Sequence, residues 1–499
     1  MAETADHVDV LVIGAGLSGI GAACHLREEH PGRSVLVLEA REAIGGTWDL
    51  FRYPGIRSDS DMFTLGYDFR PWRSAKAIAD GPSILAYVRE TAAAYGVDRR
   101  IRYGHRAVRA SWSSADARWT VVAETAAGER TLTCGFLYCN TGYYRYDEGY
   151  TPAFAGVGDF AGALVHPQQW PADLDWTGKR VVVIGSGATA VTLVPSMAER
   201  AAHVTMLQRS PTYITALPSR DVVHEKLSKV LPPRALYGVV RTKNVATMTL
   251  SYQFARRRPD LMKKLLRAGA ARALPAGFDV DTHLAPAYDP WDQRLCVVPD
   301  GDLFRVIREG RASIVTDTVD RLVPEGVRLG SGEVLEADVV VTATGLNLLA
   351  LGGLLLEVDG EPVELGRTYL YKGMMLSGVP NLALTIGYTN ASWTLKADLV
   401  ARYVCRLLRH LDRTGADTAT PDASDLGPET DAVPAIDLQA GYVLRSVGAL
   451  PKQGPRVPWR MHQNYPRDVR LMRRGPVTDA MRVTRSADRA PDARTPTSV

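Results

Sequence analysis

Two glycine-rich motifs have the residue types and the spacing that bind a dinucleotide. The first is Gly14-x-Gly16-x-x-Gly19, and the second, at residues 185–190, reads G-x-G-x-x-A. Glycines at these positions permit a tight turn and let backbone N–H groups approach a pyrophosphate at the start of a helix. A turn without a ligand is the alternative for either motif alone. Together the two motifs predict two bound dinucleotides.

The residues that follow each motif distinguish the two nucleotides. Glu39 ends the apolar strand after the first motif, where a carboxylate accepts hydrogen bonds from ribose hydroxyls. The corresponding place after the second motif holds Arg209 and Ser210. A guanidinium there matches a 2′-phosphate, although a surface arginine without a ligand is the alternative. We therefore predict FAD at the first motif and NADPH at the second.

Both motifs lie in a strand–turn–helix pattern that positions them. Short apolar runs predict buried parallel strands at residues 8–13, 35–38, 180–184 and 204–207. Further strands at 132–138 and 339–343 end at Thr-Gly, where the chain returns to each nucleotide. The predicted fold class is α/β, with two Rossmann-like dinucleotide-binding domains, one for FAD and one for NADP.

A loop at residues 45–59, G-G-T-W-D-L-F-R-Y-P-G-I-R-S-D, follows the first nucleotide motif. In flavin disulfide reductases, which share this opening, a redox cysteine pair follows the corresponding Gly-Gly-Thr, but Trp48 stands here. Cys134 and Cys139 have the spacing of such a pair, yet they fall on a predicted strand far from the loop. We interpret them as core thiols, which disfavours a disulfide reductase.

The linker between the two motifs carries the spacing F-x-G-x-x-x-H-x-x-x-W. Its fixed residues are Phe160, Gly162, His166 and Trp170, followed by Pro171. A turn, a loop histidine and a core aromatic residue are the alternative interpretation of these residues alone. The segment resembles the fingerprint of Baeyer–Villiger monooxygenases, which are class B flavin monooxygenases, at every fixed position. The resemblance extends over most of the chain through R-Y-P-G at 52–55, W-D-Q-R-L at 291–295 and G-Y-T-N-A-S-W-T at 387–394.

This resemblance implies two sets of cofactor-binding residues. The implied FAD site comprises Gly14, Gly16, Ser18, Gly19, Glu39, Gly46, Thr47, Trp48, Asp49, Leu50, Asp59, Ala107, Asn390 and Thr394. The implied NADP(H) site comprises Arg57, Ser58, Asp59, Gly185, Ser186, Gly187, Ala188, Thr189, Ala190, Val191, Thr192, Arg209 and Ser210. Gln293 departs from the lysine that many family members carry there, which leaves its contact with the nucleotide open.

The resemblance also implies Arg294 as the catalytic cation, oriented by Asp59. Hydride passes from NADPH to FAD, and the reduced flavin takes up O2 as a C4a-peroxyflavin. A guanidinium stays charged at working pH and donates hydrogen bonds to a developing oxyanion. His166 and Trp170 are expected to couple the position of NADP to domain movement.

The implied reaction converts ketones into esters or lactones, with oxidation of sulfides or thioamides at sulfur beside it. A class B monooxygenase limited to N- or S-oxygenation is one alternative, and a non-catalytic NADP-sensing protein is another. The natural ketone and the oligomeric state stay open.

The motif positions predict the domain organisation. We expect an FAD domain at 1–142 and 371–483, an NADP domain at 143–370 and a disordered tail at 484–499. A helical, basic insertion at about 215–290 interrupts the NADP domain. Solvated helix faces explain this insertion, and weak peripheral contact with a membrane is the alternative.

Composition narrows the class of protein. The chain is 46% hydrophobic and 23% charged with a net charge of +4, which fits a globular protein and gives no reason to expect a nucleic-acid partner. Five scattered cysteines without a C-x-x-C pair or a Cys/His cluster argue against a disulfide scaffold and a metal site. No leader or membrane-spanning run is recognised, so we expect a cytoplasmic protein, with the inner face of the membrane as a peripheral location.

Overall fold

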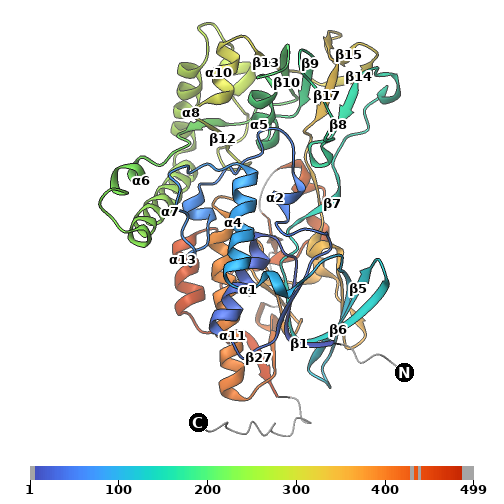
Figure 1. Ribbon diagram of the computed structural model, residues 1–499, viewed down its shortest axis with the longest axis vertical. Helices are drawn as coiled ribbons and strands as arrows, with labels where there is room; N and C mark the ends of the chain where they lie inside the picture. The colour runs from blue at the N-terminus through green and yellow to red at the C-terminus, as the bar shows by residue number, and fades with distance from the viewer. Residues whose placement is uncertain (1–5, 427–431, 437–439, 486–499) are drawn as a thin grey trace.

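The computed structural model describes residues 6–426, 432–436 and 440–485. Its two largest sheets lie toward opposite ends of the long axis, and helix α2 (Thr47–Leu50) and strand β7 (Tyr144–Gly149) lie between them (Figure 1). The expected α/β class with two Rossmann-like folds is confirmed.

The first sheet is built around strand β1 (Asp6–Ile13). Eight of its nine strands follow the order β20-β19-β4-β5-β6-β1-β2-β3, and the ninth, β23, pairs with β6. β1 runs parallel to both of its neighbours, and Val10, Leu11 and Val12 have no exposed surface, as expected for a strand covered on both faces. The other strands are β2 (Val35–Leu38), β3 (Ile101–Arg102), β4 (Arg106–Ser113), β5 (Arg118–Thr125), β6 (Gly128–Cys139), β19 (Leu355–Val358), β20 (Glu361–Pro362) and β23 (Leu382–Leu384).

Cys134 and Cys139 both lie on β6. They are free and buried, opposite Val8 and Ile13 of β1. The interpretation of both residues as core thiols is confirmed.

Three helices cover one face of this sheet: α1 (Leu17–Glu29), α4 (Gly81–Ala94) and α11 (Trp393–Thr414) (Figure 1). α4 begins after Asp80, whose side chain accepts a hydrogen bond from the Ser83 N–H, and Pro82 occupies the first turn. α1 and α11 pack against each other although they are far apart in the sequence. Helix α11 therefore joins the last part of the chain to the first nucleotide motif.

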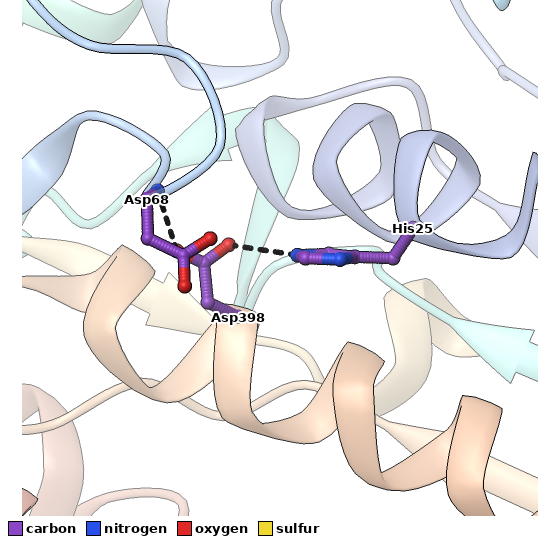
Figure 2. A group of neighbouring side chains, drawn as sticks. All are labelled: His25, Asp68 and Asp398. Atoms are coloured by element: carbon purple, nitrogen blue, oxygen red, sulfur yellow. Dashed lines mark hydrogen bonds and ion pairs between the residues drawn. The ribbon is translucent and has the colours of Figure 1, made fainter. Parts of the chain in front are cut away.

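A charged cluster lies where α1 and α11 meet (Figure 2). His25 of α1 and Asp398 of α11 approach to 3.4 Å, and Asp398 also accepts a hydrogen bond from the Asp68 N–H at 3.1 Å. Three acidic and imidazole groups this close resemble a metal site. However, the guanidinium groups of Arg402 and Arg473 lie within 3.1 Å of the Asp68 carboxylate, and that of Arg241 within 3.6 Å of Asp398. These cations already neutralise both carboxylates, so we assign the cluster to helix packing.

The second sheet has five parallel strands in the order β13-β10-β9-β17-β8. The strands are β8 (Ala163–Val165), β9 (Arg180–Ile184), β10 (His203–Gln208), β13 (Ala312–Thr316) and β17 (Val339–Thr342). Helices α5 (Ala188–Met197) and α10 (Asp302–Arg308) pack against each other beside it. The central strand β9 leads directly into the second glycine motif, as the sequence predicts.

The insertion is mostly helical, as expected. It contains α6 (Val222–Leu227), α7 (Pro233–Arg257), α8 (Pro259–Ala273) and α9 (Val280–Leu284), and α6 and α7 project to one side of the molecule (Figure 1). Its expected start at residue 215 is wrong, because residues 214–217 form strand β11, which pairs with β12 (Cys296–Pro299). The helices follow that strand.

Two of the expected domain limits also need correction. β19 pairs with β4, and Leu356 is buried in the core of the first sheet, so the chain returns to that sheet before residue 371. Thr484 belongs to β27 (Met481–Thr484), which pairs with β24 (Thr418–Pro421), so the expected tail begins too early. Residues 486–499 lie outside the described part of the chain.

The remaining elements surround the two sheets. They include α3 (Met62–Leu65), β14 (Val319–Val323), β15 (Gly326–Leu329), β16 (Val334–Glu336), β18 (Leu346–Leu348), α12 (Gly441–Leu444) and α13 (Tyr465–Val469). Within the described ranges, no helix has the length and hydropathy needed to cross a membrane.

Candidate active site

A cavity of about 310 Å³ lies between the two glycine motifs. Its wall is drawn from chain segments that are distant in sequence: 16–18, 45–60, 140–146, 188–192, 294–297 and 386–393, together with Ile436 and Tyr442. Both sheets therefore contribute to one site.

The first glycine of each motif is required by the fold itself. Gly14 has φ +101°, and a Cβ there would lie 2.6 Å from the Asn140 carbonyl oxygen. Gly185 has φ +137°, and its Cβ would lie 2.3 Å from the Ala343 carbonyl oxygen. In both loops the backbone that leaves a neighbouring parallel strand, β6 or β17, passes too close to the glycine for any side chain.

The middle glycine of each motif is not required by the protein's own packing. A Cβ on Gly187 would meet nothing within 4 Å, and one on Gly16 would meet only Gly46, at an ordinary 3.6 Å. Both glycines immediately precede a helix, and neither helix start is capped by a side chain. The open space and the free N–H groups fit a pyrophosphate at each helix start. The residues present thus fit two dinucleotides.

The acidic and the basic residue that follow the motifs have different surroundings. Glu39 is buried, and its carboxylate accepts hydrogen bonds from the Ala15 N–H at 2.7 Å and the Arg41 N–H at 3.0 Å. Burial raises the pKa of Glu39 above its ordinary value. Arg209 is exposed and makes no ion pair with a carboxylate of the described chain. Its guanidinium is therefore available to an anionic ligand.

Asp59 and Arg294, which the sequence separates widely, meet in the cavity. Arg294 Nη2 lies 3.7 Å from Asp59 Oδ2, and the two side chains are 40% and 30% exposed. The Asp59 carboxylate raises the pKa of Arg294 further above its ordinary value. Asp59 comes from the loop of the first fold and Arg294 from the chain just before β12. The expected pair is thus formed by one residue from each half.

Five of the expected FAD residues line the same cavity: Gly16, Ser18, Thr47, Trp48 and Asp59. Ser18 Oγ accepts a hydrogen bond from Trp393 Nε1 at 2.8 Å, and Thr47 Oγ1 is 2.6 Å from the Tyr144 hydroxyl. The first bond joins the first glycine motif to α11, and the second joins α2 to β7.

Other expected FAD residues point elsewhere. The Asp49 carboxylate is buried among Arg41, Arg52 and Arg89. Asn390 donates to the Gln463 carbonyl oxygen at 2.9 Å and borders a separate small crevice. None of Leu50, Ala107 and Thr394 lines the cavity, and Ala107 and Thr394 are buried.

The expected NADP residues divide in the same way. Arg57, Ser58, Ala188 and Thr192 line the cavity, whereas Ala190 and Val191 are buried on the core side of α5. Ser186 Oγ donates to the Ser210 carbonyl oxygen at 3.3 Å, which places both on one rim with Arg209. The Arg57 guanidinium is engaged by Asp302 at 2.5 Å, so it joins the two halves of the protein.

No fingerprint residue lines the cavity. A Cβ on Gly162 would lie 2.4 Å from the Asp338 carbonyl oxygen, and Phe160 packs beside it. The His166 ring packs against Gly149 of β7, and burial lowers its pKa. Trp170, which precedes Pro171, makes an edge contact with Trp176 at 6.0 Å.

Sequence reasoning missed two glutamines inside the fingerprint. Gln168 Nε2 donates to the carbonyl oxygens of Arg145 and Tyr146 at 2.8 and 2.9 Å, and Gln169 Nε2 donates to that of Asp147 at 3.0 Å. The linker therefore holds strand β7 in place. No spacing rule identifies them, because their partners are backbone atoms.

Aromatic residues on and beside β7 were missed as well. Tyr143, Tyr144 and Tyr146 line the cavity, as does Tyr442 of α12. The first three come just after Thr141-Gly142, where the chain leaves β6 next to the first nucleotide. That position could have identified them as site residues from the sequence. Tyr442 reaches the site only through the tertiary fold.

Two dinucleotide folds that share a cavity define an FAD- and NADP-dependent oxidoreductase. Residues 12–75 match a model of the NAD(P)-binding Rossmann-like domain, and residues 78–225 match a model of flavin-binding monooxygenase-like proteins.

Curated relatives cover almost the whole chain. The FAD-containing monooxygenase EthA of Mycobacterium tuberculosis is 55% identical over 95% of this chain and 97% of its own length. The probable FAD-binding monooxygenase AlmA of Acinetobacter baylyi is 46% identical over 95% of each chain. The chain belongs to the family of FAD-containing monooxygenases, and FAD and NADP(H) are its cofactors. The resemblance drawn from the sequence is confirmed.

Solved structures share the fold. A steroid monooxygenase bound to NADP has a TM-score of 0.76 at 21% identity, over 96% of this chain and all of the other. An open cyclohexanone monooxygenase has a TM-score of 0.70 at 20% identity, over 84% of this chain and 90% of the other.

Proposed function

We propose that the protein is an NADPH- and O2-dependent monooxygenase that converts ketones into esters or lactones by Baeyer–Villiger oxidation. Oxidation of sulfides or thioamides at sulfur is a second activity of the same site. The observation that carries the proposal is the Arg294–Asp59 pair in the cavity between the two nucleotide folds. FAD, when bound there, accepts hydride and supplies the activated oxygen.

Arg294 supplies a fixed positive charge to the reacting carbonyl. Its guanidinium is charged at any working pH and donates hydrogen bonds to the oxyanion that forms when the carbonyl carbon is attacked. Asp59 orients it without removing it from the cavity, since both side chains keep exposed surface. A charge that is already in place costs no reorganisation during the reaction.

The cofactor-binding roles follow the motifs. We assign the helix starts after Gly16 and Gly187 to the two pyrophosphates, Glu39 to the FAD ribose, and Arg209 with Ser210 to the 2′-phosphate. Ser18, Thr47 and Trp48 face the same cavity as Arg294, where the flavin ring must lie to exchange hydride with NADPH. The names of the solved relatives, steroid and cyclohexanone monooxygenases, support a carbonyl substrate.

A product assay tests the proposal. Purified FAD-loaded protein receives NADPH, 18O2 and a panel of cyclic and aryl ketones, and products are followed by mass spectrometry. Ester or lactone that carries one 18O atom supports the proposal. NADPH consumption that yields sulfoxide or N-oxide from sulfide and amine controls, but no ester from any ketone, supports the narrower N- or S-oxygenase instead.

We also propose that α7 and α8 make weak contact with an anionic membrane surface. Leu250 (69% exposed) and Phe254 of α7 and Leu261 and Leu265 (54% exposed) of α8 present apolar side chains. The exposed cations Arg257 of α7, Lys264 of α8 and Arg258 between the two helices form no ion pair within the described chain. Apolar and basic groups together match a surface of anionic lipid.

Sedimentation with phosphatidylglycerol vesicles at low salt tests this contact. Leu250→Glu is expected to reduce binding, while Leu355→Glu, at an equally exposed leucine on β19, leaves it unchanged. Equal sedimentation with neutral vesicles, or a concentration-dependent dimer that Leu250→Glu abolishes, contradicts the membrane assignment.

A further inference from the structure

Two tyrosines in the cavity wall carry hydroxyl groups that no described residue uses. Tyr143 and Tyr442 both line the cavity, together with Arg294 and Asp59. Neither hydroxyl forms a hydrogen bond within the described part of the chain, whereas the neighbouring Tyr144 hydroxyl lies 2.6 Å from Thr47 Oγ1. A phenol in a partly apolar site usually finds a partner, so these two are available to a ligand.

Each phenol is held by a different part of the fold. Tyr143 lies in the segment between β6 and β7. Its ring stacks on that of Trp393, with the ring centres 5.3 Å apart. Tyr442 lies on α12, and its partly buried ring packs against the buried cluster of Ile436, Val443 and Leu450. The rings are therefore positioned by packing and leave their hydroxyl groups free.

Both phenols lie near the cation. The Asp59 carboxylate raises the pKa of Arg294 most strongly, and Tyr143 and Tyr442 act in the same direction. Burial raises the pKa of both phenols, so they remain protonated donors at neutral pH. A neutral donor next to a guanidinium adds a hydrogen bond without another charge.

We propose that Tyr442, with Tyr143 beside it, binds the carbonyl oxygen of the substrate and holds it next to Arg294. This inference rests on the proposed function for the carbonyl class of substrate. The aromatic side chains of Trp48, Tyr143 and Trp393 also line the cavity, whose exposed lining is mostly apolar. The preferred substrate is accordingly a hydrophobic ketone with one acceptor oxygen and no charge. Tyr442 is a substrate-positioning residue supplied by the last part of the chain.

Binding without turnover tests the proposal. Oxidised, FAD-loaded protein without NADPH is titrated with 4-phenyl-2-butanone, and butylbenzene, which has the same skeleton without the carbonyl group, competes in ligand-observed NMR. Tyr442→Phe is expected to weaken the ketone about fivefold to tenfold, the net worth of one hydrogen bond. The hydrocarbon is expected to bind Tyr442→Phe and the parent equally, and Tyr143→Phe to give a smaller loss for the ketone.

Tyr252→Phe is the matched control. Tyr252 stacks edge-on to Trp291 outside this cavity, and its hydroxyl also forms no hydrogen bond within the described chain. Unchanged ketone affinity in Tyr442→Phe, or an equal loss for ketone and hydrocarbon, overturns the proposal. A changed KM for NADPH with unchanged ketone affinity overturns it too, since the phenol then serves the coenzyme. The two proposals can fail separately. If ketone binding depends on Tyr442 but the protein makes no ester, the proposed function is contradicted and the ketone-binding site is supported.

Discussion

The loops at residues 14–19 and 185–190 repeat one design in different surroundings. The first lies against a nine-stranded mixed sheet and is held by the buried Glu39 carboxylate, which bonds to the Ala15 N–H. The second lies on a five-stranded parallel sheet and has the exposed Arg209 at its rim. The first loop is thus built into the core, and the second stays open to solvent.

This difference matches what each nucleotide must do. A flavin that remains bound through many turnovers suits a loop fixed by buried hydrogen bonds. A coenzyme that is exchanged suits an open loop with a charged contact, because exposed electrostatic contacts form and break readily. The chemistry that we propose lies between the halves, where Asp59 of one meets Arg294 of the other.

Valine at the first glycine of the FAD loop and valine at the middle glycine of the NADP loop are expected to have the largest effects, on different cofactors. Gly14→Val is expected to abolish FAD binding and most of the soluble yield, because a Cβ there meets Asn140 and φ is positive. Gly187→Val is expected to fold and keep FAD, since nothing in the protein lies within 4 Å of the new Cβ. Its KM for NADPH should rise on the order of 100-fold. Flavin absorbance measures the bound FAD, and steady-state kinetics measures KM for NADPH. Equal loss of FAD in both variants would contradict the difference that we draw between the two loops.

Arg294→Ala tests whether the second half supplies the charge for oxygen insertion. Ester formation should fall by about 10² to 10³, the usual effect of removing one oxyanion donor. FAD content should stay the same and NADPH should still reduce the flavin. The two electrons of the reduced flavin should then pass to O2 and give hydrogen peroxide instead of ester. Stopped-flow reduction and product analysis separate the two steps. Ester production near the parent rate would falsify the role of Arg294.

Arg209→Ala sharpens the comparison at the open loop. KM for NADPH is expected to rise about tenfold or more, because a charge-assisted hydrogen bond is worth about 1.5–3 kcal/mol. KM for NADH should stay within about twofold, since NADH lacks the 2′-phosphate. Steady-state kinetics with both coenzymes measures the difference, with Arg257→Ala on α7 as the control. An equal change of KM for both coenzymes would contradict the proposed contact between Arg209 and the 2′-phosphate.

Asp59→Ala gives the smallest expected effect. The arginine remains but is no longer oriented, so the ester yield per NADPH should drop about tenfold or less, in line with about 1 kcal/mol for a partly exposed ion pair. Sulfide oxidation should fall less than ketone oxidation, because it develops no oxyanion at a carbonyl. A loss as large as that of Arg294→Ala would place Asp59 in the chemistry itself.

The sequence predicted the parts of this fold that depend on local patterns. The strand expected at 180–184 is the strand found, because a central parallel strand is buried on both faces and reads as a continuous apolar run. Glycine spacing located both helix starts, because the glycine motif and the helix that follows it are adjacent in the sequence. The pairing of β19 with β4 was missed, since strand partners distant in the chain leave no periodic signal.

The candidate site divides in the same way. Asp59 and Arg294 were named from motifs, and the structure brings them together. The ion pair between Arg57 and Asp302 was not foreseen, because the two residues are 245 positions apart. Tyr442 was missed for a related cause, as its segment has no motif and reaches the cavity only by packing on β18.

The hydrogen bonds from Gln168 and Gln169 to β7 matter for laboratory evolution of this enzyme. These two amides set the position of a strand whose tyrosines form part of the cavity wall. A mutant library at residues 166–170 will therefore shift substrate preference without altering any residue in the wall. A chimera that takes its second sheet from a relative should therefore retain Gln168 and Gln169. Without them, the chimeric protein is expected to bind its coenzyme but to lose its substrate selectivity.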